Sequence, residues 1–317
     1  MARTIALLAS DPSHLPLLTV FKESGVTQKY GFEIEVDVVG GAKAPTMAHR
    51  TRLLLAGEID FVSGVHHETY RARARGEKRF VYLAQTQNNW DDRLLVSPEI
   101  TSIQDLKGKR ILCHLKVPCI SGNLTAILES CGLKREEFEI YPIETMSGNL
   151  LAYVDRVVAG EASATLVDMP FDLYGKKKGL KILGLPERPV IHNTTILTTT
   201  DYIKNNEDTV TVFLKALIEA IHFFKTRPDE VVGILRRNLA KRFGLDDEEY
   251  YVHLQREWAN LLLRKPYPLA AAIQNVFDLD AGKDSKVHND VSPLEPWDLH
   301  YLRVIDDSGF IDKLYAA

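Results

Sequence analysis

The stretch Leu53-Leu-Leu-Ala-Gly-Glu-Ile-Asp-Phe-Val-Ser-Gly-Val-His-His-Glu-Thr-Tyr70 decides the fold. Its pattern predicts a helix, a short buried strand from Ile59 to Val62, a polar turn at Ser63-Gly64, and a second helix. A further strand is expected from Phe80 to Ala84. Helices that alternate with short buried strands are typical of an α/β sheet covered on both faces.

Polar and small residues gather where these strands end. In α/β sheets, ligands bind at the carboxyl ends of the strands, because helix N-termini and free backbone N–H groups converge there. Seven residues of this region fall at such ends: Ser63, Gly64, His66, His67, Glu68, Gln87 and Asn88. The sequence therefore predicts a binding site more clearly than it predicts a reaction.

The alternation of strands and helices continues on both sides of this stretch. A first strand, Thr4–Leu8, leads to Ser10 and Asp11 in a turn that we expect to face a ligand, and a helix follows over Leu15–Glu23. Further strands are predicted at 31–40, 93–96, 111–115, 138–143, 163–167 and 181–183, and helices at 46–56, 123–130 and 149–158. The β-branched run Thr194–Thr200 is interpreted as a strand that returns to the first domain.

The last third of the chain is predicted to be helical. Apolar residues at Val210, Phe213, Leu217, Ile221 and Phe224 keep the spacing of one buried helix face. Helices are also expected near 228–239, 247–262, 269–278 and 297–315. This third has no catalytic pattern, and we expect it to cover the first domain.

A short internal repeat supports two similar halves. Arg52-Leu-Leu-Leu-Ala-Gly-Glu58 precedes one predicted strand, and Arg156-Val-Val-Ala-Gly-Glu161 precedes another. Two α/β halves of this kind would each present loops to a shared ligand site.

Composition limits the class of protein. A chain of 317 residues with 45% hydrophobic residues suggests two domains with ordinary cores, and a net charge of −4 gives no electrostatic reason to bind nucleic acid or anionic membranes. No apolar run approaches the roughly 18–20 residues of a membrane span, so we expect no membrane insertion. Three cysteines without a CxxC spacing and an N-terminal apolar run too short for a signal peptide favour a cytoplasmic protein as the sequence stands; removal of a leader would make it periplasmic or cell-surface.

Several segments together resemble a known fold. They are Leu54–Phe61, Ile103–Ile111, Gly160–Pro170, Phe213–Ala220 and Thr226–Asp229. The chain resembles the periplasmic-binding-protein fold of type II, in particular the nitrate/sulfonate/taurine and thiamine-pyrimidine-precursor-binding family. The resemblance implies two α/β lobes, each a mixed, mostly parallel sheet flanked by helices, with a helical C-terminal third.

The same resemblance implies how the chain is divided. Lobe 1 is expected to comprise 1–94 and 195–317, and lobe 2 to comprise 95–194. Two crossovers, near 91–97 and 188–195, would form a Venus-flytrap hinge that closes on a ligand.

Two functions are compatible with this resemblance. The first is a solute-binding protein of ABC-importer type, with a small anionic or heteroaromatic ligand and an ABC permease as the partner. The second is a cytoplasmic enzyme on the same scaffold, a cofactor-independent decarboxylase or lyase of dihydroxyphthalate or sulfinate type, because the chain shows no secretion signal and carries ionisable groups over 65–70. Neither reading requires a cofactor or metal, and the oligomeric state stays open.

His66-His67-Glu68 is the sharpest candidate for chemistry. A histidine at a strand end is a suitable general acid or base near neutral pH, and an adjacent carboxylate can orient it. The alternatives are a ligand contact without chemistry and simple helix capping. Consecutive side chains point in different directions, so two adjacent histidines are poorly placed to hold one metal ion.

The predicted second lobe offers a matching set of residues. Ser121, Gly122 and Asn123 stand where a helix begins and are suited to bind an oxyanion. Cys119, just before them, is either a nucleophile of desulfinase type or an inert thiol. Asp168, at the end of the strand 163–167, and Asn193, at the second crossover, would complete the ligand site or serve only as cap and turn residues.

Overall fold

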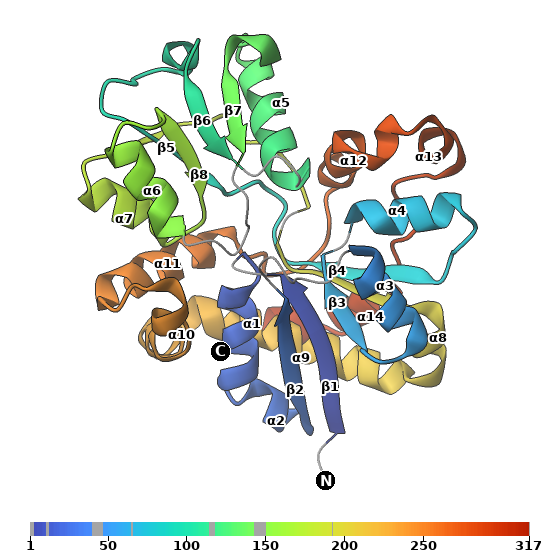
Figure 1. Cartoon of the computed structure of the whole chain (residues 1–317). Helices are drawn as coiled ribbons and strands as arrows, with labels where there is room; N and C mark the ends of the chain where they lie inside the picture. Colours follow the sequence, from blue (N-terminus) through green and yellow to red (C-terminus); the bar gives the residue numbers. More distant parts are fainter. Residues whose placement is uncertain are drawn as a thin grey trace.

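Two five-stranded sheets organise the molecule (Figure 1). The computed structural model describes residues 3–10, 13–39, 47–64, 66–113, 118–142, 150–191 and 193–316. The first sheet has the order β2-β1-β3-β10-β4 and contains β1 (Arg3–Ser10), β2 (Phe32–Val39), β3 (Phe61–Ser63), β4 (Phe80–Gln85) and β10 (Thr195–Thr199). The second has the order β7-β6-β8-β5-β9 and contains β5 (Arg93–Val96), β6 (Arg110–Cys113), β7 (Glu139–Pro142), β8 (Ala164–Val167) and β9 (Lys181–Leu183).

The two sheets share one topology. In the first sheet, β10 alone is reversed, being antiparallel to both β3 and β4. In the second, β5 alone is reversed, being antiparallel to both β8 and β9. The remaining strands of each sheet run in one direction, so the expected mixed, mostly parallel sheets are confirmed. The reversed strands are the two through which the chain enters the second sheet and returns to the first.

Helices flank both sheets (Figure 1). Those before β5 and just after β10 are α1 (Leu15–Glu23), α2 (Val26–Lys29), α3 (Met47–Ala56), α4 (His66–Ala74), α8 (Thr200–Asn205) and α9 (Glu207–Thr226). Between β5 and β9 the chain forms η1 (Ile103–Leu106), η2 (Pro118–Gly122), α5 (Asn123–Ser130), η3 (Arg135–Glu137), α6 (Leu150–Val158) and α7 (Phe171–Lys177). The C-terminal part forms α10 (Pro228–Phe243), α11 (Glu248–Leu261), α12 (Ala270–Leu279), η4 (Ala281–Lys283), α13 (Ser285–Asp290), α14 (His300–Asp307) and α15 (Phe310–Ala316).

The internal repeat is a pair of matched helix ends. Gly57 after α3 and Gly160 after α6 both have left-handed φ values, 71° and 78°. The next N–H in each case returns to the helix, from Glu58 to the Leu53 carbonyl at 3.1 Å and from Glu161 to the Arg156 carbonyl at 3.0 Å. Glycine adopts this conformation without the penalty a Cβ brings, so the Ala-Gly-Glu sequence ends each helix and directs the chain into β3 or β8. These two strands occupy the same central position in their sheets.

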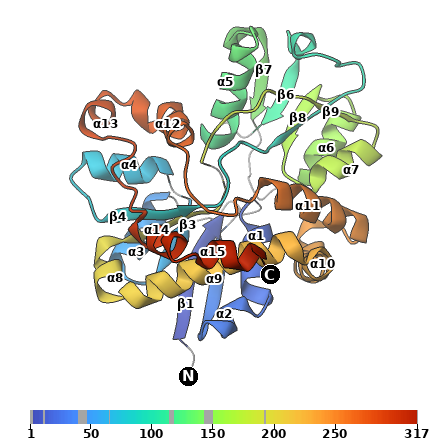
Figure 2. The same cartoon turned by 180° about the vertical axis from the view of Figure 1, so that it is seen from behind.

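The core of the first sheet centres on α9. Phe213 of α9 stacks on Phe61 of β3 with ring centroids 4.1 Å apart, and it meets Phe21 of α1 edge-on at 5.4 Å. Residues Val210, Phe213, Leu217, Ile221 and Phe224 are all buried, as their spacing predicts. Figure 2, the view from behind, shows α9 in front of the first sheet, with α14 and α15 beside it.

The C-terminal third also contacts the second sheet. His253 of α11 lies 2.8 Å, Nε2 to Oδ2, from the buried Asp172 of α7. Arg93 of β5 pairs with Glu257 of α11 at 3.4 Å. α11 therefore contacts the second sheet as well as the first domain, which this third was expected to cover.

One expected helix is two helices. The predicted helix 297–315 is interrupted between α14 and α15, where Gly309 has a φ of 73°. The Gly309 N–H is 2.8 Å from the Asp306 carbonyl, so the glycine ends α14 and the chain turns before α15 begins. The short α7 and α13 carry too few residues for periodicity to reveal them.

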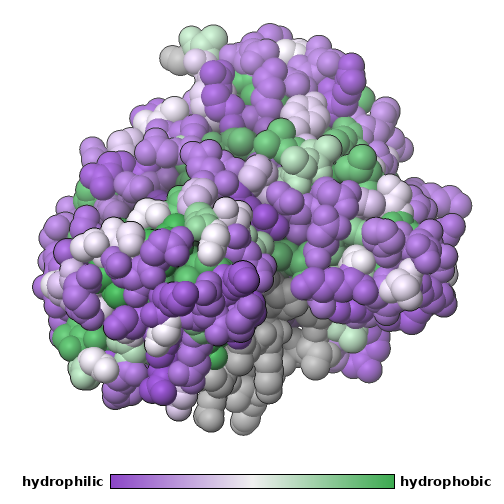
Figure 3. Space-filling view, turned by 90° about the horizontal axis from the view of Figure 1, so that it is seen from above, coloured by the Kyte–Doolittle hydropathy of each residue, from purple (hydrophilic) through white to green (hydrophobic). Residues whose placement is uncertain are grey.

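Hydrophilic residues cover most of the face shown in Figure 3. The more exposed large hydrophobic residues, such as Val158, Val252 and Leu294, lie on separate elements. Across the described ranges, no helix has the length and apolar character needed to cross a membrane.

Replacing Phe213 with Ala is expected to lower the free energy of unfolding by about 3–5 kcal/mol, because the side chain is fully buried and its removal leaves a cavity against three aromatic rings. Urea denaturation followed by circular dichroism measures this loss. The control is Val252→Ala on the exposed face of α11, which should change stability by less than about 0.5 kcal/mol. Similar losses in both variants would contradict this account of the core.

Candidate functional site

Two crossover segments connect the sheets and pair with each other. Residues 86–92 lead from β4 to β5, and residues 184–194 lead from β9 back to β10. The Thr86 N–H donates to the Thr194 carbonyl at 3.2 Å, and further along Trp90 N–H donates to the Arg188 carbonyl at 3.0 Å. The crossovers thus pair antiparallel, as β4 and β10 do, with a shift in register between Thr86–Thr194 and Asn89–Pro189. The first crossover begins at residue 86 and the second at residue 184, a few residues before the expected starts near 91 and 188.

Side chains reinforce the crossover pair. Asn193 has a left-handed φ of 52°, which an asparagine tolerates better than most residues. Its Nδ2 donates to Asp91 Oδ1 at 3.3 Å, and both residues are buried. Because the amide N–H₂ faces a carboxylate, the Asn193 Oδ1 must point elsewhere. Asp91 and Asn193 therefore link the two crossovers at the junction between the sheets.

The loop from β3 to α4 is tied into the first sheet. Ser63 Oγ lies 2.6 Å from His14 Nδ1, and the Gly64 N–H donates to the Thr195 carbonyl at 3.0 Å. His66 Nε2 is 2.8 Å from Thr195 Oγ1, whose hydroxyl donates to Gln85 Oε1. Since that hydroxyl proton is already used, His66 donates from Nε2 to Thr195. This sets the tautomer of a buried imidazole.

His67 and Cys119 meet between the two halves of the chain. Cys119 lies in η2, which follows β6 of the second sheet, and its Sγ is 3.4 Å from Nε2 of His67 on α4. His67 Nδ1 is 3.9 Å from Asp280 Oδ2, and Asp280 is also paired with Arg71. Elements that follow β3 of the first sheet and β6 of the second are therefore in direct contact.

Burial keeps this contact uncharged. Burial lowers the pKa of His67 to about 4, with smaller effects from Asp280, which raises it, and from Arg71 and Lys283, which lower it. Burial, together with the carboxylates of Asp92 and Asp280, raises the pKa of Cys119 to about 12. At pH 7 the pair is a neutral imidazole and a thiol. With the imidazole proton on Nδ1, facing Asp280, the thiol donates to Nε2.

The residues at the start of α5 are held by protein contacts. Asn123 Nδ2 donates to the Cys119 carbonyl at 2.7 Å, and its Oδ1 accepts from Arg188 Nε at 3.0 Å. Gly122 faces α12: a Cβ at this position would lie 3.2 Å from Leu279 Cδ2. The Ser121 carbonyl accepts from Thr125. The oxyanion role predicted for Ser121, Gly122 and Asn123 stays a prediction.

Other predicted residues lie farther from the His67–Cys119 contact or are engaged elsewhere. Glu68 pairs with Arg75 at 2.5 Å, and the Asn88 side chain bridges the Tyr267 carbonyl at 2.8 Å and the Leu269 N–H at 3.0 Å. Asp168 follows β8 and its carbonyl accepts from Phe171 N–H. Ser10 is the last residue of β1. The side chain of Ser10 and the whole of Asp11 lie outside the described residues.

Gln87 differs from its neighbours. It is 1% exposed, yet neither its Oε1 nor its Nε2 has a hydrogen-bond partner in the part of the chain that the structure describes. The same holds for Asn193 Oδ1 and Thr194 Oγ1 on the facing crossover. Buried polar atoms are rarely left in this state in native proteins.

Sequence reasoning missed the residues that contact or lie close to His67 and Ser63. Asp280, Arg71 and His14 carry no motif that links them to His67 or Ser63. A weak signal for Asp280 lies in the acidic residues over 278–284, at the end of α12. Among the described residues, no three His, Cys, Asp or Glu side chains are grouped so as to hold a metal ion.

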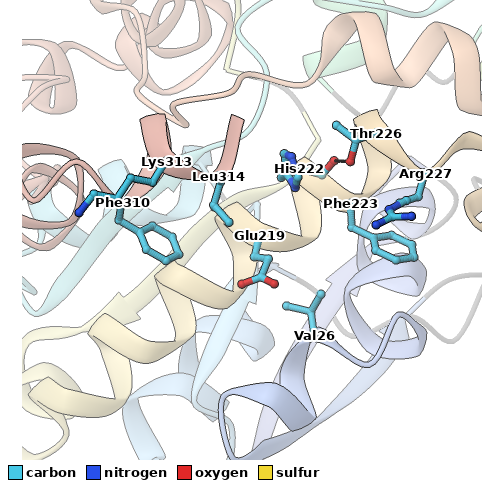
Figure 4. Close-up of a pocket in the computed structure, with 9 residues that line it drawn as sticks. All are labelled: Val26, Glu219, His222, Phe223, Thr226, Arg227, Phe310, Lys313 and Leu314. Carbon is cyan, nitrogen blue, oxygen red and sulfur yellow. Dashed lines mark hydrogen bonds between the residues drawn. The ribbon is translucent and has the colours of Figure 1, made fainter. Parts of the chain in front are cut away.

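A separate hollow lies on the far side of α9 (Figure 4). Its volume is about 360 Å³, and it is formed by α2, α9, α15 and the residue after α9; the lining residues are Val26, Glu219, His222, Phe223, Thr226, Arg227, Phe310, Lys313 and Leu314. Glu219 is already bound by Lys29 at 2.6 Å and Tyr30 at 2.8 Å. No predicted site residue lines it, so it is a weaker candidate than the crossover region.

Comparison with known proteins identifies the fold. A family model described as "NMT1/THI5 like" matches residues 31–231, more than half of the chain. The periplasmic aliphatic sulphonate-binding protein SsuA from Escherichia coli is 15% identical, with a TM-score of 0.66 and coverage of 93% of this chain and 99% of that chain. A sulfonate-binding SsuA from Methylobacillus flagellatus KT is 16% identical, with a TM-score of 0.64 and coverage of 98% and 96%.

An enzyme has a similar structure. The desulfurization enzyme DszB is 14% identical, with a TM-score of 0.65 and coverage of 96% of this chain and 99% of that chain. No curated protein matches the sequence. These structures confirm the periplasmic-binding-protein-like fold, and at such low identity they carry neither a ligand nor an activity to this chain.

Acidification should destabilise the protein through His67. The pKa of His67 falls from 6.5 in the unfolded chain to about 4 in the folded protein. Below pH 6.5 the unfolded chain therefore binds a proton that the folded protein does not, and the free energy of unfolding falls until the pH reaches about 4. Between pH 7 and pH 5 the loss is about 2 kcal/mol. His67→Gln, which cannot titrate, should show a correspondingly smaller difference in unfolding free energy between these two pH values.

The control is His300→Gln, at an exposed position. Urea denaturation at pH 7 and pH 5 should give the same pH dependence for this variant and the parent protein. An equal pH dependence in His67→Gln and the parent protein would contradict the buried neutral state of His67.

Proposed function

Because the chain belongs to the NMT1/THI5-like family, we propose that it is a solute-binding protein of ABC-importer type that closes by a hinge on a small anionic or heteroaromatic molecule. The observation that carries the proposal is the meeting of His67 on α4 with Cys119 on η2. α4 follows β3 of the first sheet and η2 follows β6 of the second, and the paired crossovers join the two sheets. Ligands in open α/β sheets bind outside such strand ends.

The proposed division of the chain follows the crossovers. Residues 1–94 and 195–317 form lobe 1, and 95–194 form lobe 2. Closure would be a rotation absorbed by a few backbone dihedral angles, for which Asn193 and its neighbours in the crossovers are the natural place. The ligand would lie beside the crossovers, within reach of Gln87 and Asn193.

The enzymatic alternative is less well supported. A decarboxylase or lyase of the kind considered would need a histidine that donates a proton near pH 7. The pKa of His67, about 4, makes it a poor general acid at that pH, and His66 donates to Thr195. Cys119, with a pKa of about 12, is equally unsuited to act as a thiolate nucleophile.

A transport role implies a permease as partner and a location in the periplasm or at the cell surface. The binding function can be tested without either. It requires only that the purified chain retain a ligand and release it unchanged.

The decisive experiment uses a pool of aromatic carboxylates, sulfonates, sulfinates and pyrimidines, incubated with purified protein at one-hundredth of the pool's concentration. We expect mass spectrometry to find one compound retained one-to-one after desalting, with no product in the pool. Small-angle scattering should then show a smaller radius of gyration with that compound than without it, since closure brings the lobes together.

If the loss of one compound exceeds the protein concentration and an equal amount of a product appears, the protein is an enzyme and the proposed binding function is wrong. Retention without any change in the radius of gyration would preserve binding and reject the hinge. If no compound in the pool is retained, the proposed ligand classes are wrong.

A further inference from the structure

Four uncharged residues of the two crossovers hold buried polar atoms that lack a hydrogen-bond partner among the described residues. Within the described ranges, hydrogen-bond partners are missing for both amide atoms of Gln87, for Asn193 Oδ1, for Thr194 Oγ1 and for Trp90 Nε1. Gln87, Asn193 and Thr194 are 1%, 5% and 0% exposed. All four residues lie on the two paired crossovers.

The backbone pairing brings these residues together. Thr195 faces Gln85 in the β4–β10 ladder, and Thr86 N–H bonds to the Thr194 carbonyl one step further along. Gln87 and Asn193 are the next residues along the two crossovers, before the register shifts to the Asn89–Pro189 pair. Gln85 Nε2 also donates to the Gln87 carbonyl, which fixes the backbone at that point.

The orientation of Asn193 is determined by Asp91. Its Nδ2 faces the Asp91 carboxylate at 3.3–3.4 Å, so Oδ1 is the atom left for a partner, and it can only accept. Gln87 offers an acceptor and a donor side by side. A partner that satisfies both residues must therefore present N–H donors and a carbonyl-type acceptor.

The charges around this cluster disfavour an anion. Asp91 is buried at the junction, and the carboxylates of Asp92 and Asp280 act on Cys119. His67 is neutral at pH 7. Arg71 is paired with Asp280, and Arg188 is directed to Asn123 and toward the carboxylate of Asp278. An anionic group buried beside Asp91 would face a like charge in a poorly solvated place.

We propose that the ligand bound at the crossovers is uncharged and carries a primary or cyclic amide, whose N–H and carbonyl pair with the side-chain amide of Gln87 and with Asn193 Oδ1. This inference rests on the proposed binding function and narrows its ligand class, excluding sulfonates and carboxylates. The unsatisfied amide of Gln87 is then a cost in the free protein that the ligand removes.

The first test needs no ligand. Leu has a similar size to Gln and buries no polar atoms, so Gln87→Leu should raise the melting temperature of the free protein by about 2 °C, because replacing an unsatisfied buried amide with an apolar group is neutral or stabilising. The matched control is Gln274→Leu on the exposed face of α12, which removes a solvent-exposed hydrogen bond of 2.9 Å to Asp278 and should change the melting temperature by less than about 1 °C. A fall of several degrees in Gln87→Leu alone would show that Gln87 has structural partners and would overturn the proposal.

The second test compares benzamide, benzoate and benzenesulfonate, which share a ring and differ in charge. Isothermal titration calorimetry should find benzamide bound about tenfold or more tightly than either anion. Gln87→Leu should lose that preference by about tenfold, while Gln274→Leu keeps it. Tighter binding of an anion, equal binding by Gln87→Leu, or no binding of benzamide would each overturn the inference.

The two proposals can fail separately. If the compound pool yields a carboxylate or sulfonate bound one-to-one without turnover, the solute-binding function stands and the amide inference falls. If the pool yields catalytic turnover while benzamide shows the Gln87-dependent preference, the amide inference stands and the binding function falls.

Discussion

The antiparallel pairing of the two crossovers is the interaction on which the rest of the structure depends. Backbone hydrogen bonds from Thr86 to Thr194 and from Trp90 to Arg188 carry the β4–β10 ladder out of the first sheet toward β5. A single connection between two sheets would leave their relative orientation to side-chain contacts alone. Two hydrogen-bonded connections restrict it to the rotations that a short two-stranded ribbon permits. His67 and Cys119 belong to elements of different sheets, so their contact depends on how the two sheets are oriented by the crossovers.

The reversed strands explain why the ribbon lies beside the ligand-facing loops. The chain leaves β4 at its carboxyl end and enters β5, which runs against its neighbours β8 and β9. It returns from β9 into β10, which runs against β3 and β4. Both crossovers are therefore attached at the strand ends where β3 and β8 deliver their loops. A sheet with all strands parallel would have required a longer crossover for each return.

Local sequence signals predicted much of this fold. The bounds of α1, α5 and β9 match the predicted ranges, and the glycine ends of α3 and α6 explain the repeat. These features depend on neighbouring residues, which a sequence displays directly. The state of the site depends on residues distant in sequence: His67 and Asp280 are more than 200 positions apart, as are Arg71 and Asp280. No periodicity encodes such a contact, so the sequence identified the histidines but not the burial that makes His67 neutral.

This neutrality decides what kind of site the chain can hold. A nucleophile or general acid at pH 7 needs a pKa near that pH, and burial moves the pKa of His67 and of Cys119 away from it in opposite directions. The crossovers also hold uncharged polar atoms without a partner in the part of the chain that the structure describes, each of which costs about 1–3 kcal/mol in that state. The aromatic core around Phe213 and Phe61 lies on the first sheet, away from these atoms, and supplies stability that does not depend on a ligand. A protein can therefore keep a polar, unsatisfied site in the free state, and the energy stored there favours whichever uncharged molecule completes its hydrogen bonds.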